Sequence, residues 1–384
     1  MFGTIRLPDS PDDAHATAFF KISVDERQRR APGELRLIAP EAQLPSAALV
    51  GCDDVVKDRT DVVALGSAFA PGGRPVHETS IRVASGDADK RVAVFGRRRV
   101  RWSGSRPLFD APEPFTEVVL DNRNAYGGID LRVPVPPPST IEEMARLLGH
   151  YPGLYPRNPV GKGYVVVPQP VEAELPQLEN PDDLLSPDRL VVGDASRWWQ
   201  QPMPWNVGFT ELAMFPRLLP LGASPWFAAP DDARLDEVRR GILPAGYAST
   251  GTLPRSVLTQ EGSAGLVFDE LAAGTPLLCE GMHPEGGVVR WRLPAAPRCR
   301  ITVEQTVHEV TPRLTLVRLL PAVGRMDLTY AARAPLHRAF IPRVHKHIPI
   351  AVAVEGFDPF RYEAPPTLHE ALQRGGFFAG RSEG

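Results

Sequence analysis

Hydrophobic and polar residues alternate along several short stretches of this chain, which is the pattern of half-buried β-strands. Residues 16–24 and 33–38 form the first such pair, and the charged run between them predicts a hairpin. Residues 79–83 and 90–95 form the second pair, across the turn Ser85-Gly86-Asp87. Further strands are expected at residues 277–280, 288–293, 300–307, 314–319 and 326–331. The predicted fold is therefore mostly β, an antiparallel β-sandwich-like body or two packed β lobes.

About three peripheral helices are expected beside the strands. Residues 139–148 begin with a capping box, place apolar side chains on one face and end at Gly149. Residues 231–240 carry acids in the first turn and arginines in the last, which suits the helix dipole. Residues 367–374 begin with a second capping box.

The chain has 384 residues, which is enough for two lobes, and a stiff Pro-Val-Pro-Pro-Pro connector lies at residues 134–138. We expect an N-terminal β-rich lobe over residues 1–150 with the first helix at its end. A second β-rich lobe would cover residues 151–350, and a C-terminal tail with a short helix would cover residues 351–384.

Residues 53–76 combine a charged entry, an apolar run over residues 62–70 and a turn at Pro71-Gly72-Gly73. The apolar run predicts a buried strand. Lys57 lies close before Asp61, so an ion pair that fixes the entry of the chain into the sheet is the simplest interpretation. The alternative is a partner-recognition surface, because charged loops on rigid sheets often carry function. Catalysis by paired carboxylates is not indicated, since no group of another type lies beside them.

Blocks rich in glycine, proline and charged residues follow one another along the chain. The first contains Asp53, Lys57, Thr60, Asp61, Val62, Gly66, Ala68, Ala70, Pro71, Gly72 and Gly73; the later ones contain Gly127, Gly128 and Asp130, then Asn158, Pro159, Gly161 and Gly163, then Leu175, Pro176, Glu179 and Pro181. In this order and spacing the blocks resemble the DUF2169 family of bacterial proteins, with which no catalytic motif is associated.

The later blocks predict tight local structure. Tandem glycines at Gly127 and Gly128 indicate a bend where two backbones approach closely. Asn158 is expected to hydrogen-bond the backbone in a turn. The run after it is not a phosphate-binding P-loop, because the required flanking glycine and hydroxyl residue are missing. Glu179, held between two prolines, is expected to anchor its loop to Lys162 or to an arginine.

Tryptophans and prolines gather in residues 197–226, which include Trp198, Trp199, Trp205 and Trp226. Such residues could form a platform for sugar rings or a groove for a proline-rich peptide. The simpler interpretation is that they seal the core beneath an irregular connection. If the chain has a partner groove, this segment and the loop from Lys57 to Asp61 are the ones we expect to form it.

Charge and composition reduce the number of function classes that the chain could belong to. Hydrophobic residues make up 43%, charged residues 23%, and the net charge is −3, so nothing draws the whole chain to nucleic acid or to an acidic membrane. Arg97, Arg99 and Arg101 could share one strand face and contact a phosphate backbone, but this basic run is short. The DUF2169 family usually carries an acidic residue where Arg97 stands. The 42 prolines favour short strands joined by ordered turns.

No cofactor or metal is indicated by motif. Three widely spaced cysteines favour a reducing compartment, and the N-terminal residues lack a secretory signal, so a cytoplasmic location is expected. His345 and His347 would share a strand face, but a third metal ligand is missing. No esterase elbow, zinc-protease motif or dinucleotide fingerprint occurs, and we expect no enzyme activity.

The resemblance implies a function that the residues alone do not. Members of the DUF2169 family are associated with type VI secretion systems, where they look like cytoplasmic adaptors or chaperones for a secreted effector protein. They are thought to assist its loading onto a spike made of a valine-glycine-repeat protein (VgrG) and a PAAR-type cap. The alternatives are a carbohydrate-active hydrolase, with Glu179 and Asp130 as its acid pair, and a glycan-binding β protein.

Overall fold

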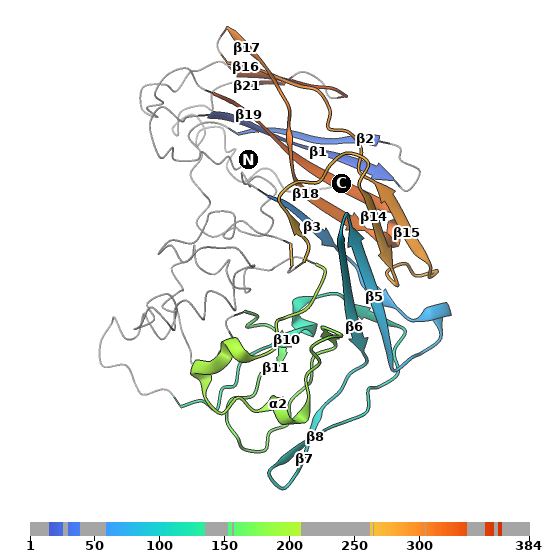
Figure 1. Cartoon of the computed structure of the whole chain (residues 1–384), viewed down its shortest axis with the longest axis vertical. Helices are drawn as coiled ribbons and strands as arrows, with labels where there is room; N and C mark the ends of the chain where they lie inside the picture. The colour runs from blue at the N-terminus through green and yellow to red at the C-terminus, as the bar shows by residue number, and fades with distance from the viewer. Residues whose placement is uncertain are drawn as a thin grey trace, which may run out of the picture.

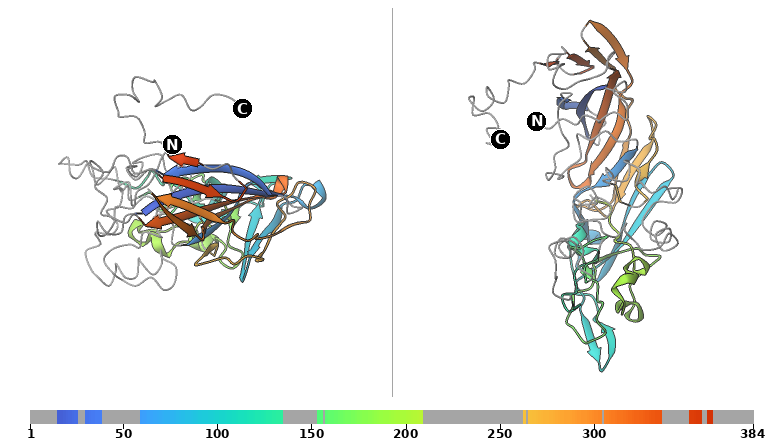
Figure 2. Two further views of the ribbon diagram at one scale, coloured as in Figure 1. Left: turned by 90° about the horizontal axis from the view of Figure 1, so that it is seen from above. Right: turned by 90° about the vertical axis from the view of Figure 1, so that its left-hand side faces the viewer.

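The computed structural model describes residues 15–25, 30–38, 59–134, 153–155, 157–208, 262–263, 265–303, 305–335, 350–356 and 360–362. These residues form an elongated molecule (Figures 1 and 2), with β-sheets at one end and a loop-rich lobe at the other. The prediction of a mostly β fold is confirmed. The three predicted helices, the histidines at 345 and 347, Asp53, Lys57 and Trp226 lie outside the described residues.

A six-stranded sheet forms the centre of the β-sheet end. In order across the sheet its strands are β13 (Val267–Phe268), β3 (Thr60–Ala64), β18 (Arg313–Leu320), β19 (Arg325–Pro335), β1 (His15–Asp25) and β2 (Arg30–Ile38). Strands β3 and β18 run parallel, and the other neighbours run antiparallel. Every residue of β3 is buried: the apolar run in the sequence accounts for residues 62–64, whereas Thr60 and Asp61 are polar. This sheet thus joins strands from both sides of residue 150, where we placed a lobe boundary.

A second sheet has five strands in the order β12 (Leu178–Glu179), β6 (Ala88–Phe95), β5 (Glu78–Ser85), β14 (Pro276–Glu280) and β15 (Val288–Arg292). The hairpin of β5 and β6 agrees with the alternation in the sequence, and Gly86 turns it with a φ of 56°. Inward residues such as Val83, Val92 and Leu277 are buried in the same core as the six-stranded sheet.

A third sheet has the order β17 (Thr306–Val310), β16 (Cys299–Val303), β20 (Ile350–Val354) and β21 (Phe360–Tyr362). Ile301 and Val352 add to the same core. Short pairs complete the strands: β4 (Ser67–Phe69) with β9 (Glu117–Val119), β7 (Val100–Ser103) with β8 (Arg106–Phe109), and β10 (Tyr126–Gly127) with β11 (Lys162–Gly163).

A second hydrophobic cluster fills the loop-rich lobe, and its largest members are Tyr126, Tyr155, Tyr164 and Trp198. The rings of Tyr126 and Tyr155 meet edge to face with centroids 5.2 Å apart, a favourable aromatic geometry. This lobe has little regular structure. Its short helical turns are η3 (Asn122–Asn124), α2 (Pro187–Leu190) and η4 (Ala195–Gln200).

Three expectations about strands need correction. Residues 300–307 do not form one strand, because β16 ends at Val303, β17 begins at Thr306, and the two pair antiparallel. Residues 62–70 do not form one strand, because Gly66, with a φ of 132°, separates β3 from β4. Residues 96–99 lie before β7 and are not a strand, although their exposure alternates as expected. Arg97 and Arg99 are exposed, whereas Arg98 points inward.

Candidate functional site

The glycine and asparagine blocks meet between the two hydrophobic cores. Strands β10 and β11 pair in parallel, so Tyr126-Gly127 lies beside Lys162-Gly163. A Cβ atom on Gly127 would lie 2.0 Å from the carbonyl oxygen of Asn158, and one on Gly161 would lie 2.6 Å from that of Ala125. Only glycine leaves room for such contacts. The predicted close approach of two backbones is confirmed.

Asn158 is the central side chain of this arrangement, and it is fully buried. Its Nδ2 donates to the backbone carbonyl of Asn122 at 2.7 Å and to that of Tyr126 at 3.1 Å. The backbone carbonyl of Asn158 accepts from the N–H of Gly128 at 2.9 Å. The expectation that Asn158 hydrogen-bonds the backbone is confirmed. We call Asn122, Tyr126, Gly127, Asn158 and Gly161 the motif junction.

The last block is tied to the same place. The N–H of Gln177 donates to the carbonyl of Asn124 at 2.8 Å, and Leu178 forms a parallel bridge with Ala125. Leu178 then continues into β12, which pairs with β6 of the five-stranded sheet. Blocks that are far apart in the sequence therefore connect one core to the other.

A buried polar chain continues from the motif junction into the β-sheet end. Asn206 Nδ2 donates to Asn122 Oδ1 at 3.0 Å, and Ser263 Oγ donates to the carbonyl of Asn206 at 2.6 Å. Lys90 Nζ donates to Ser263 Oγ at 3.1 Å and lies 3.8 Å from the ring centroid of Trp205. The ammonium group thus has a cation–π contact as well as a hydrogen bond.

Lys90 was not among the residues that the sequence analysis selected. It occupies an inward position of β6, in phase with Val92 and Val94, and is 4% exposed. Burial lowers the pKa of Lys90 to about 7. The signal in the sequence is a lysine in phase with an apolar strand face; its partner, Ser263, is distant in the chain.

Glu179 and Asp130, the acid pair of the hydrolase alternative, are each engaged by the fold. Glu179 forms an ion pair with Arg98 and accepts from the N–H of Leu185 at 2.6 Å. The expected anchor is thus an arginine, whereas Lys162 pairs with Glu174 at 2.7 Å. Burial raises the pKa of Glu179 more than Arg98 lowers it.

Asp130 binds Arg132 at 2.8 Å and accepts from the N–H groups of Val166 and Val167 at 2.8 and 3.0 Å. Burial raises the pKa of Asp130, but Arg132 and these N–H groups together outweigh it, so the pKa lies below its ordinary value. Both carboxylates thus hold loops in place.

Two tryptophan side chains of the segment 197–226 lie in the described part of the chain, those of Trp198 and Trp205. Trp198 is 1% exposed and meets Tyr155 edge to face, with centroids 6.3 Å apart. Trp205 is half-buried and donates its indole N–H to the carbonyl of Arg91 at 2.6 Å. Trp199 lies in η4, and its side chain is outside the description. Trp198 therefore packs in the core, as the simpler interpretation expected, and its ring is not accessible to a partner.

Asp61 also lies elsewhere than expected. It is part of β3 and is 1% exposed, so it is not on an exposed loop. Its neighbour Thr60 donates its hydroxyl to the carbonyl of Leu314 at 2.8 Å, which ties β3 to β18. A contact role for the segment before β3 stays a prediction.

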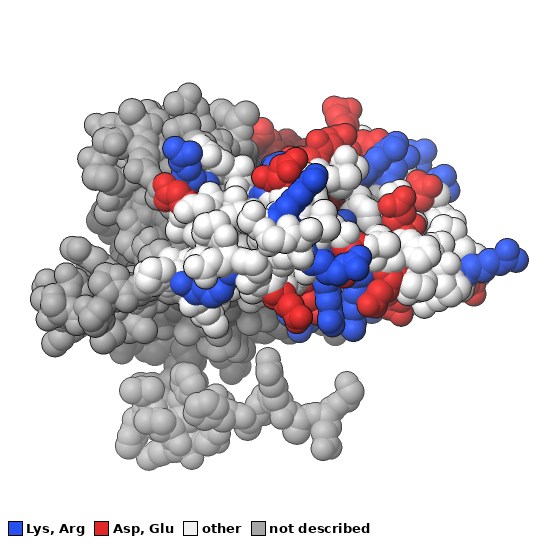
Figure 3. All heavy atoms as spheres, turned by 90° about the horizontal axis from the view of Figure 1, so that it is seen from below, with Lys and Arg blue, Asp and Glu red and all other residues white. Residues whose placement is uncertain are grey.

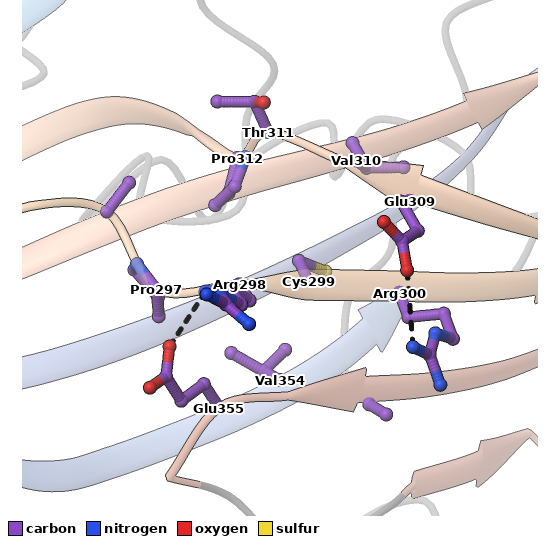
Figure 4. A pocket seen from close by; sticks show the side chains of 12 residues that line it. Pro297, Arg298, Cys299, Arg300, Glu309, Val310, Thr311, Pro312, Val354 and Glu355 are labelled. Atoms are coloured by element: carbon purple, nitrogen blue, oxygen red, sulfur yellow. Dashed lines mark hydrogen bonds and ion pairs between the residues drawn. The ribbon is translucent and has the colours of Figure 1, made fainter.

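A pocket of about 610 Å³ lies where the ends of β16, β17 and β20 meet (Figure 4). Its charged side chains partly satisfy one another. Arg300 pairs with Glu309 at 3.2 Å, and Glu355 accepts from the backbone N–H of Arg298 at 3.3 Å. Cys299 lines it too, and burial raises the pKa of this thiol to about 11, so it is a poor nucleophile at neutral pH.

Charges of both signs are mixed on the surface seen from below (Figure 3). Ion pairs elsewhere among the described residues show the same mixing of signs: Arg101 pairs with Asp110, and Arg123 pairs with Asp121 at 2.6 Å. This face therefore lacks the single-sign field that nucleic acid would require.

Within the described ranges, no three His, Cys, Asp or Glu side chains are grouped as metal ligands. The same part of the chain contains no helix long and apolar enough to cross a bilayer.

Comparison with known proteins gives one result. The sequence model of DUF2169, described as an uncharacterized protein conserved in bacteria, matches residues 14–331. The chain belongs to the DUF2169 family. Neither the curated proteins nor the solved structures contain a match. Three of the residues that carry the family resemblance, Gly127, Asn158 and Gly161, help to build the motif junction.

The motif junction predicts a steric effect that depends on position. Gly161→Ala should lower the free energy of unfolding by roughly 3 kcal/mol, because its Cβ would meet backbone on the facing segment. Gly104→Ala is the matched control: this glycine has a φ of 62° but nothing within 4 Å, so roughly 1 kcal/mol of backbone strain is expected. Urea unfolding of both variants provides the comparison, and equal losses would contradict the close packing.

Lys90 predicts a dependence of stability on pH. Its pKa is about 7 in the fold, below the ordinary value of 10.5, so between these values the unfolded chain binds more protons. Stability should therefore rise with pH in this window, by roughly 2 kcal/mol from pH 7 to pH 9. Lys90→Met removes this contribution. Urea unfolding from pH 6.5 to 9.5 measures the difference in free energy of unfolding between the parent protein and Lys90→Met. A difference that does not change with pH would contradict the lowered pKa of Lys90.

Proposed function

We propose that this protein is a cytoplasmic adaptor or chaperone that binds a secreted effector of a type VI secretion system. It would assist loading of the effector onto the spike formed by VgrG and a PAAR-type cap. Membership of the DUF2169 family supports the proposal, since that association is what the resemblance implies. The chain would act by binding, with no reaction of its own.

The observation that carries the proposal is that the residues of the family blocks make internal structural contacts. Asn158, Gly127 and Gly161 hold two backbone segments in close contact, and Glu179 forms an ion pair with Arg98. Residues used in this way define a rigid body whose surface is preformed, and rigid partners lose less entropy on binding. A chaperone needs such a body more than it needs a reactive centre.

The hydrolase alternative has weaker support. It requires one protonated and one ionised acid on either side of a cleft. Glu179 and Asp130 instead make separate internal contacts, with Arg98 and with Arg132. A glycan-binding surface would need an exposed aromatic ring, and the ring of Trp198 is buried.

Mass action gives the mechanism. A chaperone that binds only the folded effector stabilises it by an amount that grows with its concentration over Kd, about 2.7 kcal/mol at one hundred times Kd. The effector would then survive until it reaches the spike.

The test is coexpression with a candidate toxin from a type VI secretion gene cluster of the same genome, in a catalytically inactive form. Pull-down should recover a complex, and the level of the toxin should rise several-fold over expression alone, because the bound toxin escapes degradation. An unrelated toxin of similar size is the control. Absence of a complex together with an unchanged level would contradict the adaptor.

A further inference from the structure

Strand β15 forms one edge of the five-stranded sheet, next to β14 (Figure 1). Its register with β14 is regular, from Pro276 opposite Arg292 to Glu280 opposite Val288. A regular edge strand can accept a further strand, because its outer backbone groups already have the correct spacing.

The hydrogen bonds around β14 show which backbone groups of β15 face outward. Leu293 N–H donates to the carbonyl of Thr275 at 2.9 Å, toward β14. Since direction alternates along an antiparallel strand, Trp291 and Val289 also face β14, whereas Val288, Arg290 and Arg292 face away. No backbone bond to these outward groups occurs in the described part of the chain.

The side chains of Arg290 and Arg292 are exposed on one face of this edge. Among the described residues, their side chains make only long hydrogen bonds, Arg290 to the carbonyl of Val288 at 3.4 Å and Arg292 to that of Gly274 at 3.5 Å. By contrast, Arg82 on the same sheet has a carboxylate partner, Asp89, at 2.7 Å. As far as the structure describes the chain, two arginines that pair with no carboxylate thus lie beside a row of backbone donors and acceptors that make no strand bond.

The opposite face of β15 is apolar. Trp291 is 2% exposed, and partly buried Val289 packs against the main core. A strand added beside β15 would therefore lie next to arginines on one face and would extend the apolar, core-facing side of the sheet on the other.

We infer that the β15 edge binds an extended segment of a partner by strand addition, and that this segment alternates acidic and apolar residues. Its acidic residues would lie across from Arg290 and Arg292, two positions apart, and its apolar residues would lie beside Val289 and Trp291. That the partner is an effector or spike protein rests on the proposed function. The edge itself is defined by β15 alone.

Exposed charges also protect sheet edges against aggregation, and this gives a contrasting expectation. A purely protective edge would bind no peptide. Strand addition requires both the charges and the outward N–H of Arg290, so removing each should have a separate effect.

The probe is a fluorescein-labelled nine-residue peptide that alternates Glu and Val, followed by fluorescence anisotropy. The protein should bind it, and Arg290→Glu with Arg292→Glu should weaken binding roughly tenfold or more, as two ion pairs become repulsions. The double variant Arg97→Glu with Arg99→Glu is the matched control, because it makes the same charge change at exposed alternate positions; its affinity should stay unchanged. A Lys–Val peptide should not bind.

A second comparison isolates the backbone. Arg290→Ala removes the charge, whereas Arg290→Pro also removes the outward N–H, which an edge strand tolerates. Proline should weaken binding several-fold more than alanine, with thermal unfolding confirming that both fold. No binding of the Glu–Val peptide, or equal binding by the charge-reversal and control variants, would overturn the inference. If the toxin binds the β15 charge-reversal variant as well as it binds the parent protein, the adaptor stands and the edge site fails.

Discussion

The buried amide of Asn158 is the interaction on which the rest of this structure depends. Its Nδ2 donates to two backbone carbonyls: that of Tyr126, and that of Asn122, which also accepts from the N–H of Ala125 at 3.1 Å. A buried carbonyl that loses a hydrogen bond is expensive, so this side chain stabilises the shape of the surrounding loops. This hydrogen bonding requires glycine at positions 127 and 161, since any larger residue would push the two segments apart.

This arrangement explains how a lobe with few strands can be well defined. Tyr126 belongs to the cluster of the loop-rich lobe, while its neighbour Ala125 belongs to the core of the β-sheets. The motif junction lies between them and passes through Asn206 and Ser263 to Lys90. Polar groups buried in this way favour one arrangement of the chain, because a rearrangement would break these hydrogen bonds inside the protein. A scaffold fixed at its centre can carry different binding surfaces at its edges.

The local features of this fold could be predicted from the sequence. Alternation gave the hairpin of β5 and β6, and the chemistry of Asn158 and of the tandem glycines indicated a tight turn and a close approach. Features set by distant residues could not be predicted. The parallel pairing of β3 with β18 joins residues 254 positions apart, as the bond from Thr60 to Leu314 shows. Lys90 and Ser263 are 173 positions apart, and no local pattern relates them. The burial of Asp61 and Trp198 has the same cause, since charge and aromaticity do not reveal which strands will cover a residue.

The most direct measurement is hydrogen exchange of Asn158→Asp, compared with the parent protein. This change keeps the size of the side chain but replaces an N–H donor with an acceptor facing two carbonyl oxygens, at a cost of roughly 3 kcal/mol. If the motif junction couples the two cores, amides in β11 and in β18 and β19 should lose protection together. Normal protection in both regions, or a loss confined to the turn around residue 158, would contradict the account.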